Sequence, residues 1–157
     1  MSAQHREVMH RKYRMLLQFL DDLRPYAALD RAGRRKEHYA IERLLQLLGA
    51  SSADLGLQLL KVHGRHLAAS YREIFAALRT HLELPEELAD RLMDACAMRN
   101  VLTHLYDAID HERVIDSVEP AIALYEQYAE WVSERLQAEL RATARRAQAD
   151  GDDYSDQ

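Results

Sequence analysis

Residues 111–136 read HERVIDSVEPAIALYEQYAEWVSERL, and their apolar side chains recur at steps of three and four. This spacing places the apolar side chains along one face of an α-helix. Asp110 precedes the stretch as a candidate N-cap, and Pro120 is expected to kink the helix or to begin its main part. The pattern predicts a long helix from near His111, whose apolar stripe consists of Ile115, Val118, Ile122, Tyr125, Ala129, Val132 and Leu136.

Four segments that precede this stretch in the chain have the same helical spacing of apolar residues. Short polar connections separate them, and the whole chain contains only 5 glycines and 3 prolines to interrupt its elements. Long elements with few breakers are typical of helices. We therefore expect helices over about residues 4–24, 35–64, 70–82 and 85–99.

Local signals mark the boundaries of these segments. Pro25 disfavours helical geometry at the residue before it, so the first helix should stop there. The polar stretch from Asp30 to Arg35 should link it to the second helix, whose leucines on more than one side predict a central position. Ser70 has capping-box spacing for the start of the third helix. Gly49–Ser52 lies inside the second segment, where we expect a kink or, alternatively, a break into two helices.

The composition agrees with a helical protein. With 157 residues, 48% hydrophobic and 30% charged, the chain suits one globular domain. No segment alternates strictly between apolar and polar residues, so no sheet is expected. We predict an all-α fold, an antiparallel bundle of about five helices. Residues 1–146 should form the domain and residues 147–157 a disordered acidic tail.

The sequence also argues against several locations and partners. No apolar run is long enough to span a membrane, and the N-terminal residues lack the apolar core of a signal peptide, so we expect a cytoplasmic protein without membrane contact. Cys96, the single cysteine, lies on an apolar helix face and is expected to be a buried, inert thiol. The net charge of −5 means that contact with RNA would have to be local. Basic clusters occur near Arg11 and Arg35, and at Arg145–Arg146, but their simpler interpretation is solvated helix surface.

Most sequence signatures of chemistry are absent. There is no glycine-rich phosphate loop, no serine-nucleophile turn and no cysteine pair for zinc. His63 and His66 lie three apart and could seat a metal ion, but without a matching carboxylate a surface pair is the better interpretation. Asp107, Asp110 and Asp116 are better explained as a link, a cap and a helix face. We expect no cofactor and no metal site.

The remaining candidate is the spacing Arg99-x4-His104-x-Tyr106. Chance supplies about one Arg-x4-His pair in a chain of this composition, and roughly 0.05 once the tyrosine is required. In an unbroken helix Arg99 and His104 would lie about 140° apart, so they would converge better if the helix ended between them. A cation and a histidine that face one anion suit phosphate chemistry. The alternative is that Arg99 pairs with a carboxylate and His104 is a satisfied histidine at a helix end.

The segment AMRNVLTHLYDAID, residues 97–110, closely resembles the signature region of HepT-like toxins, a branch of the HEPN superfamily. The hallmark of that branch is an arginine, a polar residue, then histidine and tyrosine, and Asn100 fills the polar position. Residues 38–48, 70–78 and 84–95 look similar to the family's flanking helices. The resemblance covers about residues 35–130, and Gly49–Ser52 departs from the family's unbroken second helix.

This resemblance implies a metal-independent endoribonuclease that acts as the toxin of a toxin–antitoxin pair. His104 would transfer the proton of the ribose 2′-OH, Arg99 would hold two phosphate oxygens, and Asn100 would orient the phosphate or support the arginine. Family members are similar in being homodimers, which would bring a second histidine to the cleft. Tyr106 would be modified with AMP by an MntA-like nucleotidyltransferase antitoxin, or it could instead pack against or orient His104.

Two further hypotheses belong to other classes of function. The chain could be a non-catalytic helical subunit that binds a nucleotidyltransferase partner and helps to position its substrate. The net charge of −5 suits that role at least as well as RNA binding. The third hypothesis is a stand-alone structural bundle.

Overall fold

The structure is a computed structural model that describes residues 1–65, 70–104 and 110–152. Within these ranges every regular element is a helix, which confirms the predicted all-α class. The five expected long helices are present as α1 (Ala3–Leu23), α3 (His38–Val62), α4 (Tyr71–Leu82), α5 (Glu86–His104) and α7 (Val118–Asp152). Two short elements, η1 (Arg24–Ala28) and α2 (Arg31–Lys36), were not predicted, and the start of the expected last helix forms a separate short helix, α6 (His111–Asp116).

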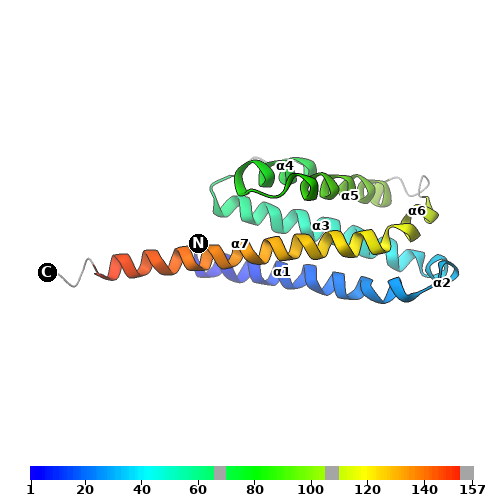
Figure 1. The fold of residues 1–157 in the computed structure, drawn as a ribbon, viewed down its shortest axis with the longest axis horizontal. Helices are drawn as coiled ribbons and strands as arrows, with labels where there is room; N and C mark the ends of the chain where they lie inside the picture. The colour runs from blue at the N-terminus through cyan, green and yellow to red at the C-terminus, as the bar shows by residue number, and fades with distance from the viewer. Residues whose placement is uncertain (66–69, 105–109, 153–157) are drawn as a thin grey trace.

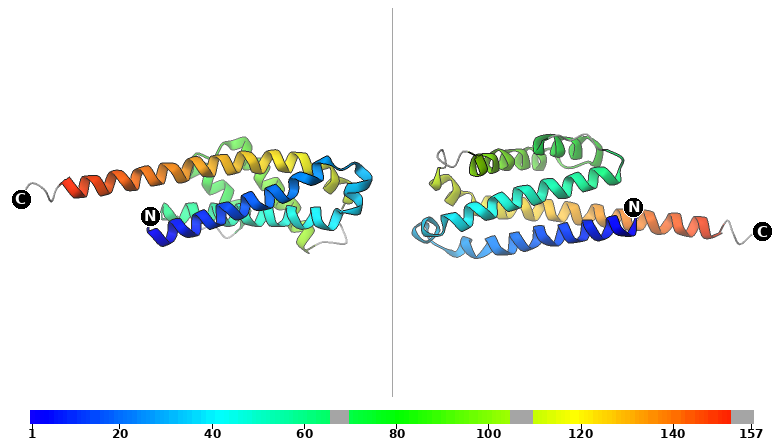
Figure 2. Two further views of the ribbon diagram at one scale, coloured as in Figure 1. Left: turned by 90° about the horizontal axis from the view of Figure 1, so that it is seen from below. Right: turned by 180° about the vertical axis from the view of Figure 1, so that it is seen from behind.

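Helices α1 and α5 run in one direction along the molecule, and α3 and α7 run in the opposite direction (Figure 1). Figure 1 shows α1 and α7 side by side along the length of the molecule, with α3 next to them and the α4–α5 pair beyond α3. Helix α3 packs against α1, α4, α5 and α7, which confirms the central position expected from its leucines. The C-terminal part of α7 projects beyond the other helices (Figure 2). None of the described helices is both long and apolar enough to cross a bilayer.

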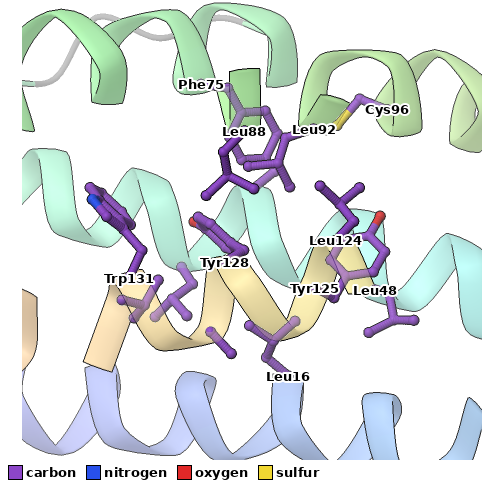
Figure 3. Packing of buried hydrophobic residues seen from close by; sticks show 14 of the residues in the cluster. Leu16, Leu48, Phe75, Leu88, Leu92, Cys96, Leu124, Tyr125, Tyr128 and Trp131 are labelled. Carbon is purple, nitrogen blue, oxygen red and sulfur yellow. The ribbon is translucent and has the colours of Figure 1, made fainter. Parts of the chain in front are cut away.

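The core lies between α7 and its neighbours. Figure 3 shows the aromatic side chains of α7 between residues of α4 and α5 on one side and Leu16 of α1 on the other. Tyr128 is fully buried, meets the Phe75 ring edge to face at 5.9 Å, and donates a hydrogen bond of 2.8 Å from its hydroxyl to the backbone oxygen of Ser52. Burial of each such large side chain contributes about 1.5–3 kcal/mol. The hydroxyl is satisfied, so the ring can be buried without an unpaired polar atom.

Helix α3 is continuous through Gly49–Ser52, so the alternative of a break into two helices is wrong. Gly56, one helical turn after Ser52, shows why α3 contains small residues in this part. A Cβ atom at Gly56 would lie 2.8 Å from Leu78 Cδ1 and 3.0 Å from Ile74 Cγ2, both on α4. The glycine therefore allows α4 to approach the backbone of α3 closely, and it does not interrupt the helix.

The predicted boundary signals act as expected. Helix α1 ends directly before the turn that contains Pro25. The Ser70 hydroxyl accepts a hydrogen bond from the Glu73 amide at 3.2 Å, and the Asp110 carboxylate accepts from the first turn of α6. Pro120 lies in the first turn of α7, where its missing N–H costs no helical hydrogen bond, so it begins the main part of the helix.

Two segments differ from their expected structure. The polar link at Asp30–Arg35 contains α2, because the Asp30 carboxylate caps a helical turn by accepting from the Gly33 amide at 2.7 Å. Helix α7 continues past Arg146, the expected end of the domain, as far as Asp152. The remainder of the expected tail lies outside the described residues.

Candidate active site

Arg99 lies on α5, where this helix passes close to Gly49 of α3. The Cβ of Arg99 would be 3.4 Å from a Cβ atom built on Gly49, and the Tyr125 hydroxyl is within 3.7 Å of the same position. The stem of the arginine therefore packs directly over Gly49, at a distance that would be an ordinary contact for a Cβ atom there. Arg99 is half-buried and lines a cavity of about 250 Å³ between α3, α5 and α7.

The guanidinium of Arg99 has no carboxylate partner in the described part of the chain. Its Cζ lies 4.7 Å from the centre of the Tyr71 ring, and its Nη1 donates to the Asn100 side-chain oxygen at 3.4 Å. The Nε atom is buried without a hydrogen-bond partner. An aromatic face attracts a cation but does not neutralise it. Arg99 is thus a positive charge that no carboxylate of the described residues neutralises, and its Nη2 has no hydrogen-bond partner among them.

The cavity beside Arg99 is lined by more positive than negative side chains, although the net charge of the whole chain is −5. Its walls include the side chains of Arg91 and Arg113 in addition to Arg99, against one carboxylate, Asp94. Arg91 donates to the Gln127 side-chain oxygen at 3.1 Å, a neutral partner. Phosphate groups bind where guanidinium groups converge. This cluster was not predicted, because Arg91 lies eight residues before Arg99 on α5 and Arg113 lies fourteen residues after it on α6.

Three members of the basic clusters that the sequence did show form ion pairs with carboxylates. Arg34 pairs with Glu119, and Arg35 pairs with Glu112, with 2.6 Å between Nε and Oε1. Lys12 pairs with Asp54. These contacts favour the simpler interpretation of the basic clusters, a solvated and partly paired helix surface.

The other motif residues are placed only in part. Helix α5 runs through His104, so it does not end between Arg99 and His104 as convergence within one chain would require. Five helical residues turn by roughly 500°, which puts positions 99 and 104 about 140° apart around the axis. Asn100 is exposed and contacts Arg99. Tyr106 lies outside the described residues.

A family model and a curated relative both match this chain over most of its length. The sequence model of the family described as Ribonuclease HepT-like matches residues 9–132. The chain belongs to the HepT-like family. A curated HepT-like relative, the tRNA nuclease HepT of Aphanizomenon flos-aquae (strain 2012/KM1/D3), is 24% identical over 132 residues, which cover 82% of this chain and 90% of the relative. The family that the sequence resembled is therefore confirmed.

Solved structures show the same fold as this HepT-like chain. The tri-AMPylated Shewanella oneidensis HEPN toxin, in complex with an MNT antitoxin, matches with a TM-score of 0.73 and 15% identity over 85% of this chain and 99% of that chain. A cytosolic protein of unknown function from Bacillus subtilis, YutE, matches with a TM-score of 0.72 and 19% identity over 83% of this chain and 92% of that one. At these identities the likeness establishes the fold alone.

Other candidate residues of this HepT-like protein have structural roles. His63 pairs with Glu139 at 2.9 Å, whereas His66 and Asp107 lie outside the described residues. Asp116 pairs with Arg31 at 2.5 Å on the surface. Cys96 is 4% exposed, and burial raises the pKa of its thiol to about 12 despite the nearby Arg99. This confirms the buried thiol, which is protonated and inert at neutral pH.

Proposed function

We propose that this chain is the toxin of a toxin–antitoxin pair and a metal-independent endoribonuclease. The observation that carries the proposal is the unpaired guanidinium of Arg99, which stacks on Tyr71 beside a cavity lined by two more arginines. Family membership supports it, because the family is described as ribonuclease-like and one relative is named a tRNA nuclease.

In the proposed mechanism RNA supplies its own nucleophile. His104 accepts the proton of a ribose 2′-OH, the 2′-oxygen attacks the adjacent phosphorus, and the 5′-oxygen of the next nucleotide leaves with a proton from a general acid. The products are a 2′,3′-cyclic phosphate and a free 5′-hydroxyl. Arg99 donates two hydrogen bonds to the phosphate oxygens as negative charge builds on them, and Asn100 holds the arginine through its side-chain oxygen.

The general acid is the reason to propose a homodimer. One histidine in each motif cannot act at once as base and acid in a single step. A two-fold axis beside α5 would bring the His104 of a second copy to the same phosphate. The angular separation of about 140° between positions 99 and 104 in one helix supports a site shared by two chains, in which each phosphate meets residues of both.

We propose a nucleotidyltransferase of the MntA type as the antitoxin and Tyr106 as its target. The Shewanella oneidensis toxin, which shares the fold, is AMPylated and bound to an MNT antitoxin. Transfer of AMP to the Tyr106 hydroxyl releases pyrophosphate from ATP and adds a bulky anion two residues after His104. That anion would occupy the space of the RNA phosphate and repel it.

Cleavage of 5′-end-labelled tRNA by the purified protein in EDTA tests the nuclease, after intact mass confirms that no AMP is attached. We expect cleavage with a cyclic phosphate end by the wild type and a loss of at least about 100-fold in His104→Ala and Arg99→Ala. The controls His81→Ala and Arg79→Ala change exposed residues of α4 and should cleave normally. Equal cleavage by His104→Ala and wild type would indicate a contaminating nuclease. No cleavage by any variant would favour the non-catalytic subunit that binds a nucleotidyltransferase.

A further inference from the structure

Glu42 is the only charged residue that is buried in the described part of the chain, with 7% of its surface exposed. It lies on α3, one turn after His38, and no lysine or arginine pairs with it in that part. Its two partners are imidazoles: Oε1 lies 3.1 Å from His38 Nδ1 and 3.0 Å from Nδ1 of His111. A carboxylate removed from water needs a positive charge close by.

The three side chains have the types and the spacing of metal ligands. One ligand atom from each of His38, Glu42 and His111 can be chosen so that all three lie within 4.8 Å of one another. Bonds of about 2.1 Å to a tetrahedral ion place ligand atoms roughly 3.4 Å apart. The two distances to Glu42 Oε1 are already close to that value, and the two imidazole rings lie 4.5 Å apart between their centres. Small rotations of the two rings would therefore bring the remaining distance, between the two histidine nitrogens, to the same value.

We propose that His38, Glu42 and His111 form a binding site for a divalent transition-metal ion, with Zn²⁺ as the most suitable ion. Two imidazoles and one carboxylate form a ligand set that Zn²⁺ commonly takes. The ion supplies the positive charge that the buried Glu42 lacks, while both imidazoles stay neutral. The His111 side chain is 53% exposed, so solvent can reach the ion and fill its remaining position.

The position of the site gives the ion a structural role. His38 and Glu42 belong to the start of α3, whereas His111 is the first residue of α6. The ion would tie α6 to α3 directly after the segment that contains Tyr106. One turn beyond Glu42, Gln46 donates to the backbone oxygen of Leu102 on α5 at 2.9 Å. The same face of α3 therefore holds both ends of the connection between α5 and α6. No chemical step of the proposed nuclease passes through this ion.

The test measures metal binding itself, on untagged protein first stripped with EDTA and dialysed. We expect titration calorimetry with Zn²⁺ to give one ion per chain and Zn²⁺ to raise the Tm. Co²⁺ should give the visible absorption of a tetrahedral site. Glu42→Gln and His111→Ala should each weaken Zn²⁺ binding by at least about tenfold and remove the rise in Tm. The matched control is His63→Ala, which removes the other histidine–carboxylate pair and should leave binding unchanged.

His111 is half-exposed, so His111→Ala should fold, and its far-UV circular dichroism provides the check. Unchanged Zn²⁺ affinity in this variant, or binding lost equally in His63→Ala, would overturn the proposal. So would the absence of stoichiometric binding to the wild type, which would leave a hydrogen-bonded cluster of two histidines around Glu42. Because no readout involves RNA, this result is independent of the nuclease test.

Discussion

The guanidinium of Arg99 lies over the ring of Tyr71, which brings α5 and α4 together at the candidate site. The distance of 4.7 Å from Cζ to the ring centre is within the range of a cation–π interaction. This contact holds the arginine without using its hydrogen-bond donors. A carboxylate in the place of Tyr71 would have bound the same donors and competed with phosphate.

Replacement of Tyr71 by leucine should therefore weaken RNA cleavage. The lost interaction is about 0.5–2 kcal/mol, or roughly 2- to 30-fold in kcat/KM. Tyr71→Phe keeps the aromatic face and should remain close to wild type. Tyr26→Leu, at a half-buried tyrosine of η1, is the control for general loss of packing. Equal losses in Tyr71→Phe and Tyr71→Leu would show that the hydroxyl, and not the ring, matters.

Two glycines of α3 should respond in opposite directions to alanine. At Gly49 the new methyl group would meet Arg99 at 3.4 Å, an ordinary contact, so the higher helix propensity of alanine should stabilise the fold by about 0.5–1 kcal/mol. At Gly56 it would lie 2.8 Å from Leu78, and the crowding should destabilise the fold by about 1–3 kcal/mol. Urea denaturation of both variants measures the difference. Equal stability of the two would contradict the close approach of α4 at Gly56.

The sequence predicted most of the fold because its local signals agree with one another. Pro25, Ser70 and Asp110 mark helix ends by short-range chemistry, and each one acts as predicted. Gly49–Ser52 left a break into two helices open because glycine weakens an isolated helix, and only the tertiary structure shows that α3 is continuous there.

The candidate site was predicted less completely than the fold. The spacing identified Arg99 and the family resemblance added Asn100, and these two side chains lie in contact. Nothing in the spacing indicated Tyr71, or the meeting of Glu42 with His111, because those partners are 28 and 69 residues apart in the chain. Such contacts depend on how helices pack, and a single sequence carries no local signal for that. The roles of His104 and Tyr106 stay predictions.

The thiol of Cys96 should resist modification in the folded protein. Burial raises its pKa to about 12, so little thiolate exists at neutral pH, and 4% exposure leaves little access. Ellman's reagent at about pH 8 should react fully only after guanidinium is added. Cys96→Ala should fold but lose stability, since it removes a buried sulfur from the packing between α5 and α7. Rapid reaction of the native protein would show that α5 opens at this point.

Glu112 should make the stability of the protein depend on pH in a defined window. Hydrogen bonds from Arg35 and then Arg31 lower the pKa of its carboxyl from 4.5 to about 2. A carboxylate with a lowered pKa in the folded state stabilises the fold above its unfolded pKa, and that contribution is lost as pH falls through the folded pKa. The contribution should therefore be complete above pH 4.5 and disappear between there and about pH 2.

The Tm of Glu112→Gln, compared with wild type, measures this contribution. The variant should melt at a lower temperature at neutral pH, and the two curves should converge as the pH falls through the window. Because Glu112 and its two arginine partners lie on the surface, the difference in Tm should be small and should shrink in high salt. Glu87→Gln, an exposed glutamate in the first turn of α5, should show no comparable convergence. A difference in Tm between the two proteins that persists unchanged to about pH 2 would mean that Glu112 acts through packing or α6 capping. Its ion pairs with α2 would then contribute nothing to stability.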